Sequence, residues 1–432
     1  MNSGQGQASL RRAIRLRHAV ALYVSSVLGS GILLLPGLAA IVAGPGSLLA
    51  WALLCVASVP FAFTFASLSS RKPESGGIYS FAKEAFGPHI ATVTGWLFGL
   101  WVITGAPAIT LIAASYLGYA FPLGRLDTLL LASLILVAAF VINYRGIVIS
   151  NRVQLASVVS IVALLLVTVV TSAFFVKAGN FSPFLPDGWL PVGTAAALIF
   201  WSFLGYENVS NMAEEFENPQ RDFRRSILLS VGLISALYLS VSIVTVGTLA
   251  YKAGGNIAPF AVMLSHVVGV YGSTGTAILA VFIIFSTVNA YTTGMSRVFY
   301  AVSRDGGLPR ALDHINPRTK VPDRALIALF IPMIPPFIIY YVLNVSLETA
   351  LLVPGGAAIV VYVIGSAAGV RIFAAKPGKS GKKRIPALPA ISLAISLIVL
   401  PFVGWLILFS VAVCVAALLY SYLVNRKSGK PV

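Results

Sequence analysis

Charge is scarce in this chain, and so are the residues of disulfide and metal chemistry. Charged residues make up 10% of the 432 residues and hydrophobic residues 58%, against about 25% and roughly 45–50% in soluble proteins. This composition excludes a mainly soluble protein, and its apolar content excludes disorder. The two cysteines, Cys55 and Cys414, are too few for a disulfide framework or a zinc site. We therefore expect no metal centre.

Long apolar runs fill most of the sequence. A membrane-spanning helix needs about 20 mostly apolar residues, and twelve stretches come close to this length. A further apolar stretch at 256–270 is short and contains Pro259, which predicts a re-entrant or interfacial segment. The twelve predicted spans are 19–43, 47–69, 91–121, 126–143, 153–176, 193–212, 226–250, 273–301, 324–343, 348–372, 386–402 and 404–424.

The positive charge lies almost entirely on one side of these spans. The net charge is +17, and an even number of spans puts both termini on one side. That side holds 27 of the 30 Lys and Arg residues, and only Arg125, Lys177 and Lys252 fall on the other. Because cytoplasmic loops carry such an excess, we expect both termini in the cytoplasm of a multi-pass protein of the cytoplasmic membrane. Charge dispersed among short loops does not favour nucleic-acid binding.

Two spans contain sequences that interrupt a helix. Residues 25–32 read Ser-Ser-Val-Leu-Gly-Ser-Gly-Ile, and residues 201–208 read Trp-Ser-Phe-Leu-Gly-Tyr-Glu-Asn. These are the first spans of two successive groups of five. In transporters built from inverted repeats, paired broken helices near the midplane frame the substrate. Glycines are also common packing residues in membrane helices, but the matching positions favour a binding site.

The chemistry of a broken helix predicts the kind of ligand. Unwinding frees backbone N–H and C=O groups, which need a partner within the membrane. The start of a half-helix favours a carboxylate, and freed carbonyls favour an ammonium. A free amino acid carries both groups, so it is the ligand that we expect.

Glu207 is the one acidic residue that falls well inside a predicted span. Ionisable residues in a membrane are costly and mark ion or substrate paths. We expect Glu207 to take part in proton coupling. A neutral carboxyl that bonds the unwound backbone is the alternative, and the two roles are compatible. Trp201 is expected either to line the pocket or to pack as an ordinary aromatic residue.

Signatures of other membrane proteins are missing from the sequence. No phosphate-binding glycine-rich loop appears, which disfavours direct ATP coupling. No paired acids or histidine cluster in the spans indicate an enzyme, and we expect no cofactor. No repeated filter or ring of charges indicates a channel. A non-transporting membrane sensor stays an alternative, although no appended soluble domain offers a route for a signal.

Four motifs, in order along the chain, resemble those of the amino acid–polyamine–organocation permeases. The first is Gly-Ser-Gly-Ile at 29–32. The second is Pro-Glu-Ser-Gly-Gly-Ile-Tyr at 73–79, followed by Ala-Phe-Gly at 85–87. The third is Glu-Asn-Pro-Gln-Arg-Asp at 217–222. The fourth runs from 296 to 309 and begins Ser-Arg-Val-Phe-Tyr-Ala. The pattern is most similar to bacterial neutral amino-acid permeases and exporters.

The resemblance implies a leucine-transporter-like fold with a 5+5 inverted repeat and two trailing helices. On this chain it implies a cytoplasmic N-terminal segment, two five-helix repeats, a trailing pair and a cytoplasmic tail, at 1–18, 19–176, 193–372, 386–424 and 425–432. It also implies amino-acid transport.

The resemblance assigns roles to residues of the two broken spans. Backbone N–H groups of the first motif would hold the substrate carboxylate, here at Ser30 and Gly31. In the arginine/agmatine antiporter branch, a Trp, a proton-sensing Glu and a span-eight aromatic fall near Trp201, Glu207 and Tyr291. The remaining substrate-binding candidates are Ser26, Val27, Gly29, Phe203, Leu204, Gly205 and Tyr206.

The sequence alone does not determine which ion is coupled to transport. Some permeases of this fold bind sodium through hydroxyls of spans one and eight, for which Ser286 and Thr287 are weak candidates. Others place a Lys in span five, and residues 153–176 contain none. The sequence favours a secondary transporter of neutral, apolar amino acids, with a cationic amino acid or amine exchanger as the alternative. The expected partners are an amino acid, a proton or sodium ion and the bilayer, and the expected state is a monomer or homodimer.

Overall fold

The computed structural model describes residues 13–71, 76–121, 123–207, 209, 212–252, 258–345, 347–375 and 386–427. These residues are overwhelmingly helical, as the apolar runs predict. The helices are α1 Leu16–Val27, α2 Gly29–Ala43, α3 Ser47–Arg71, α4 Ile78–Phe86, α5 Pro88–Ala120, α6 Arg125–Arg145, α7 Ile147–Ala173, α8 Leu190–Phe200, α9 Pro219–Gly247, α10 Pro259–Val268, α11 Val270–Arg304, α12 Asp323–Phe330, α13 Ile334–Val342, α14 Leu347–Ala374, α15 Ala387–Val399 and α16 Ile407–Lys427.

Within the described residues, nine helical stretches are long and apolar enough to cross a membrane. One of them, Leu16–Arg71, contains the first two predicted spans, so the nine account for ten of the twelve. The sixth and eleventh predicted spans correspond to the shorter apolar helices Leu190–Phe203 and Ala387–Val399. The predicted re-entrant stretch contains the short helix α10. The all-helical membrane class is therefore confirmed, while a total of twelve crossings stays a prediction.

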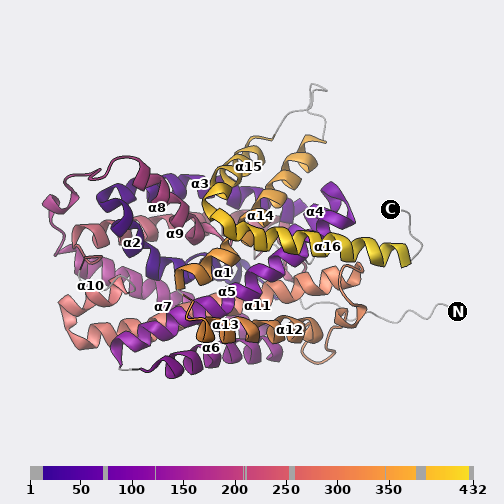
Figure 1. The fold of residues 1–432 in the computed structure, drawn as a ribbon, viewed down its shortest axis with the longest axis horizontal. Helices are drawn as coiled ribbons and strands as arrows, with labels where there is room; N and C mark the ends of the chain where they lie inside the picture. Colours follow the sequence, from indigo (N-terminus) through magenta and orange to yellow (C-terminus); the bar gives the residue numbers. More distant parts are fainter. Residues whose placement is uncertain are drawn as a thin grey trace.

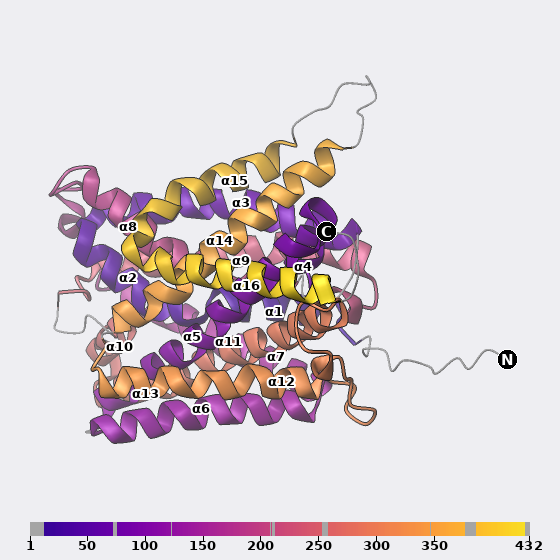
Figure 2. The same ribbon diagram turned by 45° about the vertical axis from the view of Figure 1, so that its right-hand side comes forward.

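The helices run roughly parallel, which gives the molecule two ends (Figure 1). The C-terminal end of α16, the short helix α4 and the loop after α11 lie at one end, and α10 lies at the other. The view turned by 45° gives the same arrangement (Figure 2). Two of the motifs meet at the first end, because Asp305 accepts a hydrogen bond from the Tyr79 hydroxyl at 2.8 Å and pairs with Lys83 at 2.7 Å. Residues 73–75 of the second motif lie outside the described residues.

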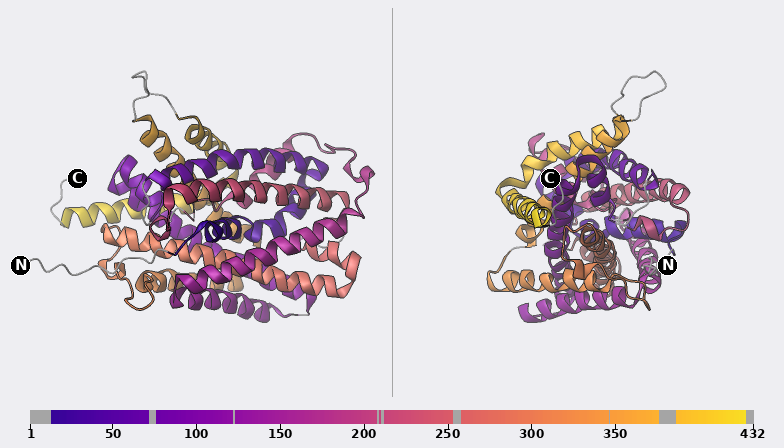
Figure 3. Two further views of the ribbon diagram at one scale, coloured as in Figure 1. Left: turned by 180° about the vertical axis from the view of Figure 1, so that it is seen from behind. Right: turned by 90° about the vertical axis from the view of Figure 1, so that its right-hand side faces the viewer.

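The broken helices belong to one packing group. Helix α9 packs along both α3 and α1, and α2 packs against α8. A second group has α5 at its centre, between α11 and α14. Seen from behind, α3, α9 and α1 lie one beneath the other (Figure 3, left). The cavity described below lies where the two groups face each other.

The first predicted span is divided at a single residue. Helix α1 ends at Val27 and α2 begins at Gly29, so only Leu28 stands between them. Both glycines at this point are in close contact with other helices. A Cβ on Gly29 would collide with the Thr287 side chain of α11, and a Cβ on Gly31 would lie 2.9 Å from Ser202 Cα. The break is therefore held against its neighbours at distances that only glycine allows.

The sixth predicted span, 193–212, is interrupted within residues 201–208, where its sequence predicts a break. Helix α8 ends at Phe200, a 3-10 turn covers Trp201–Phe203, and Leu204 is extended. Among the described residues that follow, no α-helix begins before Pro219. Gly205 has a φ of 131°, and its N–H is bonded by the Glu207 carboxylate at 2.9 Å. The side chain of Glu207 thus replaces the carbonyl that would have continued the helix.

We expect Gly31→Ala to destabilise the protein, because overpacking of a dense interior costs about 1–3 kcal/mol. The control is Gly193→Ala in α8, where an added Cβ meets no atom within 4 Å and helix propensity favours Ala. Melting temperatures of the purified variants measure the difference. Equal melting temperatures for the two variants would contradict the close approach of α2 and the 3-10 turn.

Candidate substrate-binding cavity

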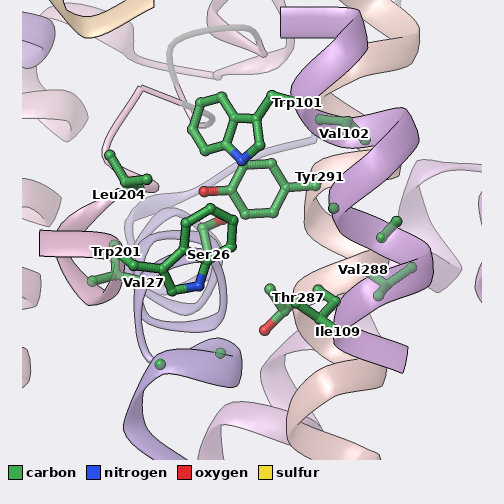
Figure 4. A pocket seen from close by; sticks show the side chains of 14 residues that line it. Ser26, Val27, Trp101, Val102, Ile109, Trp201, Leu204, Thr287, Val288 and Tyr291 are labelled. Atoms are coloured by element: carbon green, nitrogen blue, oxygen red, sulfur yellow. The ribbon is translucent and has the colours of Figure 1, made fainter. Parts of the chain in front are cut away.

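A cavity lies where the two broken segments face α5 and α11. Its volume is about 40 Å³, which is space for a few water molecules. The rings of Trp101, Tyr291 and Trp201 border this space from different elements (Figure 4). The lining residues are Ser26, Val27, Gly29, Gly31, Trp101, Val102, Gly105, Ala106, Ile109, Trp201, Leu204, Thr287, Val288 and Tyr291.

In both broken segments, residues predicted from the sequence line the cavity. The structure brings eight of the predicted residues to its lining, from α1, α2, the 3-10 turn and α11: Ser26, Val27, Gly29, Gly31, Trp201, Leu204, Thr287 and Tyr291. Ser30 lies in the first turn of α2, but its side chain lies outside the described part of the chain, as does residue Asn208. The predicted residues that do not line the cavity are Phe203, Gly205, Tyr206, Glu207 and Ser286.

The cavity offers backbone groups at both of its broken helices. The first N–H groups of α2, which starts at Gly29, have no carbonyl partner within the helix, and they carry the positive end of the helix dipole. Val27 is the last residue of α1, so its carbonyl also has no partner within that helix. A carboxylate and an ammonium can therefore be accommodated a few residues apart.

The side-chain lining is uncharged. None of the fourteen lining residues is acidic or basic, and α5 contributes four of the aliphatic and small ones: Val102, Gly105, Ala106 and Ile109. A charged ligand side chain would have no ion-pair partner among these residues, whereas an apolar one would replace water on an apolar wall.

Glu207 is buried behind the cavity wall and engaged by other groups. Its side chain is fully buried. One carboxyl oxygen, Oε2, accepts hydrogen bonds from the Gly205 N–H and from the Tyr362 hydroxyl. The other, Oε1, has no hydrogen-bond partner among the described residues. Tyr362 lies 6.5 Å, ring centre to ring centre, from the lining residue Trp101, and the lining residue Tyr291 is a further side-chain neighbour of the carboxyl.

Tyr238 of α9 joins the two broken segments directly. Its hydroxyl lies 2.7 Å from the Val27 carbonyl oxygen and 2.8 Å from that of Ser202. A phenol has one hydrogen, so it can donate to only one of these carbonyls at a time. The ring packs between Trp51 and Phe203, at 4.9 and 5.1 Å. Phe203, a predicted binding residue, therefore supports Tyr238 instead of lining the cavity.

The other predicted residues outside the lining also support the breaks. Gly205 passes so close to α1 that a Cβ would lie 2.9 Å from the Ser26 carbonyl. Tyr206 is buried with its ring 6.4 Å from that of Tyr23. These contacts fix the unwound segment of residues 204–207 against α1.

The two sodium candidates differ in their surroundings. The Thr287 hydroxyl lies 2.9 Å from the Ser25 carbonyl oxygen and 3.1 Å from that of Ile283, so its one hydrogen can join α11 to α1 directly. Ser286 is buried, and its hydroxyl has no hydrogen-bond partner among the described residues. No group of three or more His, Cys, Asp or Glu gathers anywhere in the described part of the chain.

Sequence reasoning missed the contribution of α5 and two tyrosines. Trp101, which faces Tyr291 at 5.3 Å between ring centres, lies in a continuous helix that carries no interruption. Tyr238 and Tyr362 lie in apolar spans, and only the tertiary fold shows that their hydroxyls contact the broken segments. A buried tyrosine usually has a hydrogen-bond partner, so tyrosines within apolar spans were the sequence feature that could have indicated these contacts.

An apolar, membrane-spanning fold around a central cavity with broken helices is that of a membrane carrier of small molecules. The chain belongs to the amino acid permease family, whose model matches residues 14–428. The resemblance of the motifs is thereby confirmed, and the family and its relatives are transporters, not enzymes.

Three relatives illustrate the range of the family. An uncharacterized amino acid permease, YecA of Bacillus subtilis, is 32% identical over 95% of this chain and 96% of its own. The L-methionine/branched-chain amino acid exporter YjeH of Escherichia coli is 29% identical over 98% of each chain. The vacuolar cationic amino acid transporter 2 of Arabidopsis thaliana is 31% identical over 76% of this chain and 56% of its own.

We expect Tyr238→Phe to destabilise the protein more than Tyr116→Phe. Tyr116 of α5 is a matched control, since its buried hydroxyl donates to a single carbonyl, that of Leu33, at 2.7 Å. Tyr238→Phe removes the one hydrogen that the Val27 and Ser202 carbonyls share, and with it the link between the two broken segments; an unsatisfied buried group costs about 1–3 kcal/mol. Melting temperatures measure the effect, and an equal loss in both variants would argue against a special role of Tyr238.

Proposed function

We propose that the protein is a secondary transporter of neutral, apolar amino acids that works by alternating access. The uncharged cavity between the two broken segments carries the proposal. The free N–H groups at the start of α2 suit a carboxylate, and the carbonyls at Val27 and in the 3-10 turn suit an ammonium. The exporter relative, whose name specifies methionine and branched-chain amino acids, supports this substrate class.

A cationic amino acid or amine exchanger is the second candidate, which the cationic relative supports. It requires a carboxylate to meet the ligand's second positive charge. The nearest acid, Glu207, is bonded to Gly205 and Tyr362 and does not line the cavity. This engagement favours the neutral substrate.

We further infer that Glu207 couples transport to protons. Its Oε1 lacks a partner among the described residues, whereas Oε2 holds the unwound backbone. A change of protonation would therefore act on the geometry of the broken segment next to the cavity. Sodium coupling is less favoured, because the Thr287 hydroxyl already bonds the α1 carbonyl that an ion between α1 and α11 would need. Plain exchange without a coupling ion is the other alternative.

The arrangement in the membrane is also inferred. We propose twelve crossings, with inverted five-helix repeats at 19–176 and 193–372, a trailing pair and both termini in the cytoplasm of the plasma membrane. The end of the molecule that carries α4 and the loop after α11 (Figure 1) also carries Lys83, Arg304 and Arg310. The excess of positive charge at that end supports the orientation.

We expect leucine and methionine to raise the melting temperature of the purified protein with concentration, because a ligand stabilises the state that binds it. Arginine, lysine and their amines are the comparison. In Glu207→Gln, leucine should still stabilise the protein, but the pH dependence of substrate counterflow in vesicles should be lost. Stabilisation by cationic ligands alone would transfer the assignment to the second candidate.

The α5 wall provides a test of where the substrate side chain lies. Ala106→Leu adds three carbons to the cavity lining, so it should weaken leucine binding about tenfold relative to alanine. The control is Ala163→Leu on the exposed face of α7. Competition binding measures the ratio for each variant. A leucine-to-alanine ratio unchanged in Ala106→Leu would place the side chain elsewhere.

A further inference from the structure

The chain before α1 pairs with the segment that follows the second break. Ile14 and Phe216 form a parallel bridge. The N–H groups of Ala13 and Ile14 donate to the Glu215 carbonyl at 2.9 and 3.0 Å, and the Glu217 N–H donates to the Ile14 carbonyl at 3.1 Å. The Ile14 side chain is fully buried at this contact. We refer to residues 13–15 as the strap.

The last residue of the strap adds an ion pair at the surface. Arg15 Nε lies 2.8 and 2.9 Å from the two carboxyl oxygens of Glu217. The side chains are 65% and 34% exposed, so water and salt weaken the attraction. The strap is thus held by three backbone hydrogen bonds, one buried side chain and one weak ion pair.

A second ion pair lies beneath the strap and is completely buried. Arg297 Nε of α11 lies 2.5 Å from Glu215 Oε1, and both side chains are only 1% exposed. Arg297 also donates to the Thr293 carbonyl at 3.1 Å and the Ser296 hydroxyl at 2.8 Å. Glu215 therefore binds the strap through its backbone and α11 through its carboxylate.

The buried pair joins the two packing groups at the end of the molecule that carries α4. Glu215 follows the second break, in the segment that leads into α9, while Arg297 lies on α11. Between Arg297 and the cavity residue Thr287, α11 presents the buried polar side chains Asn289 and Thr293. Polar groups along this stretch favour the passage of water and of the charged ends of an amino acid once the two groups part.

Separation of the buried pair is costly unless water reaches it first. A buried charge that loses its partner is destabilised by about 3–5 kcal/mol, whereas a hydrated pair separates with little loss. The strap covers the Glu215 backbone and is the weaker contact. Release of the strap would admit water to Glu215 and Arg297 and so lower the cost of separating them.

We propose that residues 13–15 are a releasable strap that controls opening of the cavity toward the side of the termini, by covering the Glu215–Arg297 pair. The strap does not touch the substrate cavity, so it sets access and not affinity. The inference rests on the proposed alternating access, but its geometry is independent of the substrate.

A cysteine in the cavity reports opening without any substrate. Val288→Cys is introduced after Cys55→Ala and Cys414→Ala, and a charged, membrane-impermeant thiol reagent is applied from the side of the termini. We expect Arg15→Glu, which turns the surface pair into a repulsion, to raise the labelling rate about fivefold. Ile14→Ser, which removes the buried side chain of the strap, should raise it as well.

Two controls make the result specific. Arg17→Glu makes the same change of charge two residues away, at an exposed residue of α1, and should leave labelling unchanged. Arg15→Glu combined with Glu217→Arg restores an ion pair and should restore slow labelling. Equal labelling in Arg15→Glu and Arg17→Glu, or no restoration by the charge exchange, would overturn the strap. Faster labelling in a protein that transports no amino acid would retain the strap and reject the proposed function.

Discussion

The arrangement depends on the need to satisfy backbone groups where a helix is interrupted inside a membrane. Each break frees donors and acceptors that lipid cannot solvate. The protein meets this need with side chains from neighbouring helices: Tyr238 reaches the carbonyls of Val27 and Ser202, and Glu207 takes the N–H of Gly205. The close packing at Gly29 and Gly31 brings these partners within reach. The cavity is the part of the interrupted region that no side chain fills.

Glu207 illustrates why an acid in a membrane need not face the ligand. Its burial is offset by a backbone N–H and a phenol, which together fix the unwound segment beside the cavity. The carboxylate is consequently tied by a hydrogen bond to the backbone beside the cavity. An acid that held the substrate itself would have to give up these bonds at every turnover.

Much of the architecture follows from one-dimensional patterns, since apolar length and charge asymmetry specify where helices run. The breaks at 25–32 and near Gly205 were also predictable, because glycines at matching positions of two corresponding spans favour interrupted helices. The hydrogen bond that holds the second break was not predictable, because it depends on the Glu207 carboxylate folding back to the Gly205 N–H. Trp101, Tyr238 and Tyr362 could not be placed either, since their roles arise from contacts between helices distant in sequence.

The single phenol hydrogen of Tyr238 has a consequence for hydrogen-bond stoichiometry. Two carbonyl oxygens compete for it, so these two acceptors share a single hydrogen. A primary ammonium brings three hydrogens and corrects the shortage, while each alkyl group on the nitrogen removes one. The site would then prefer primary amino acids over proline and N-methylated amino acids, whose nitrogen carries fewer hydrogens.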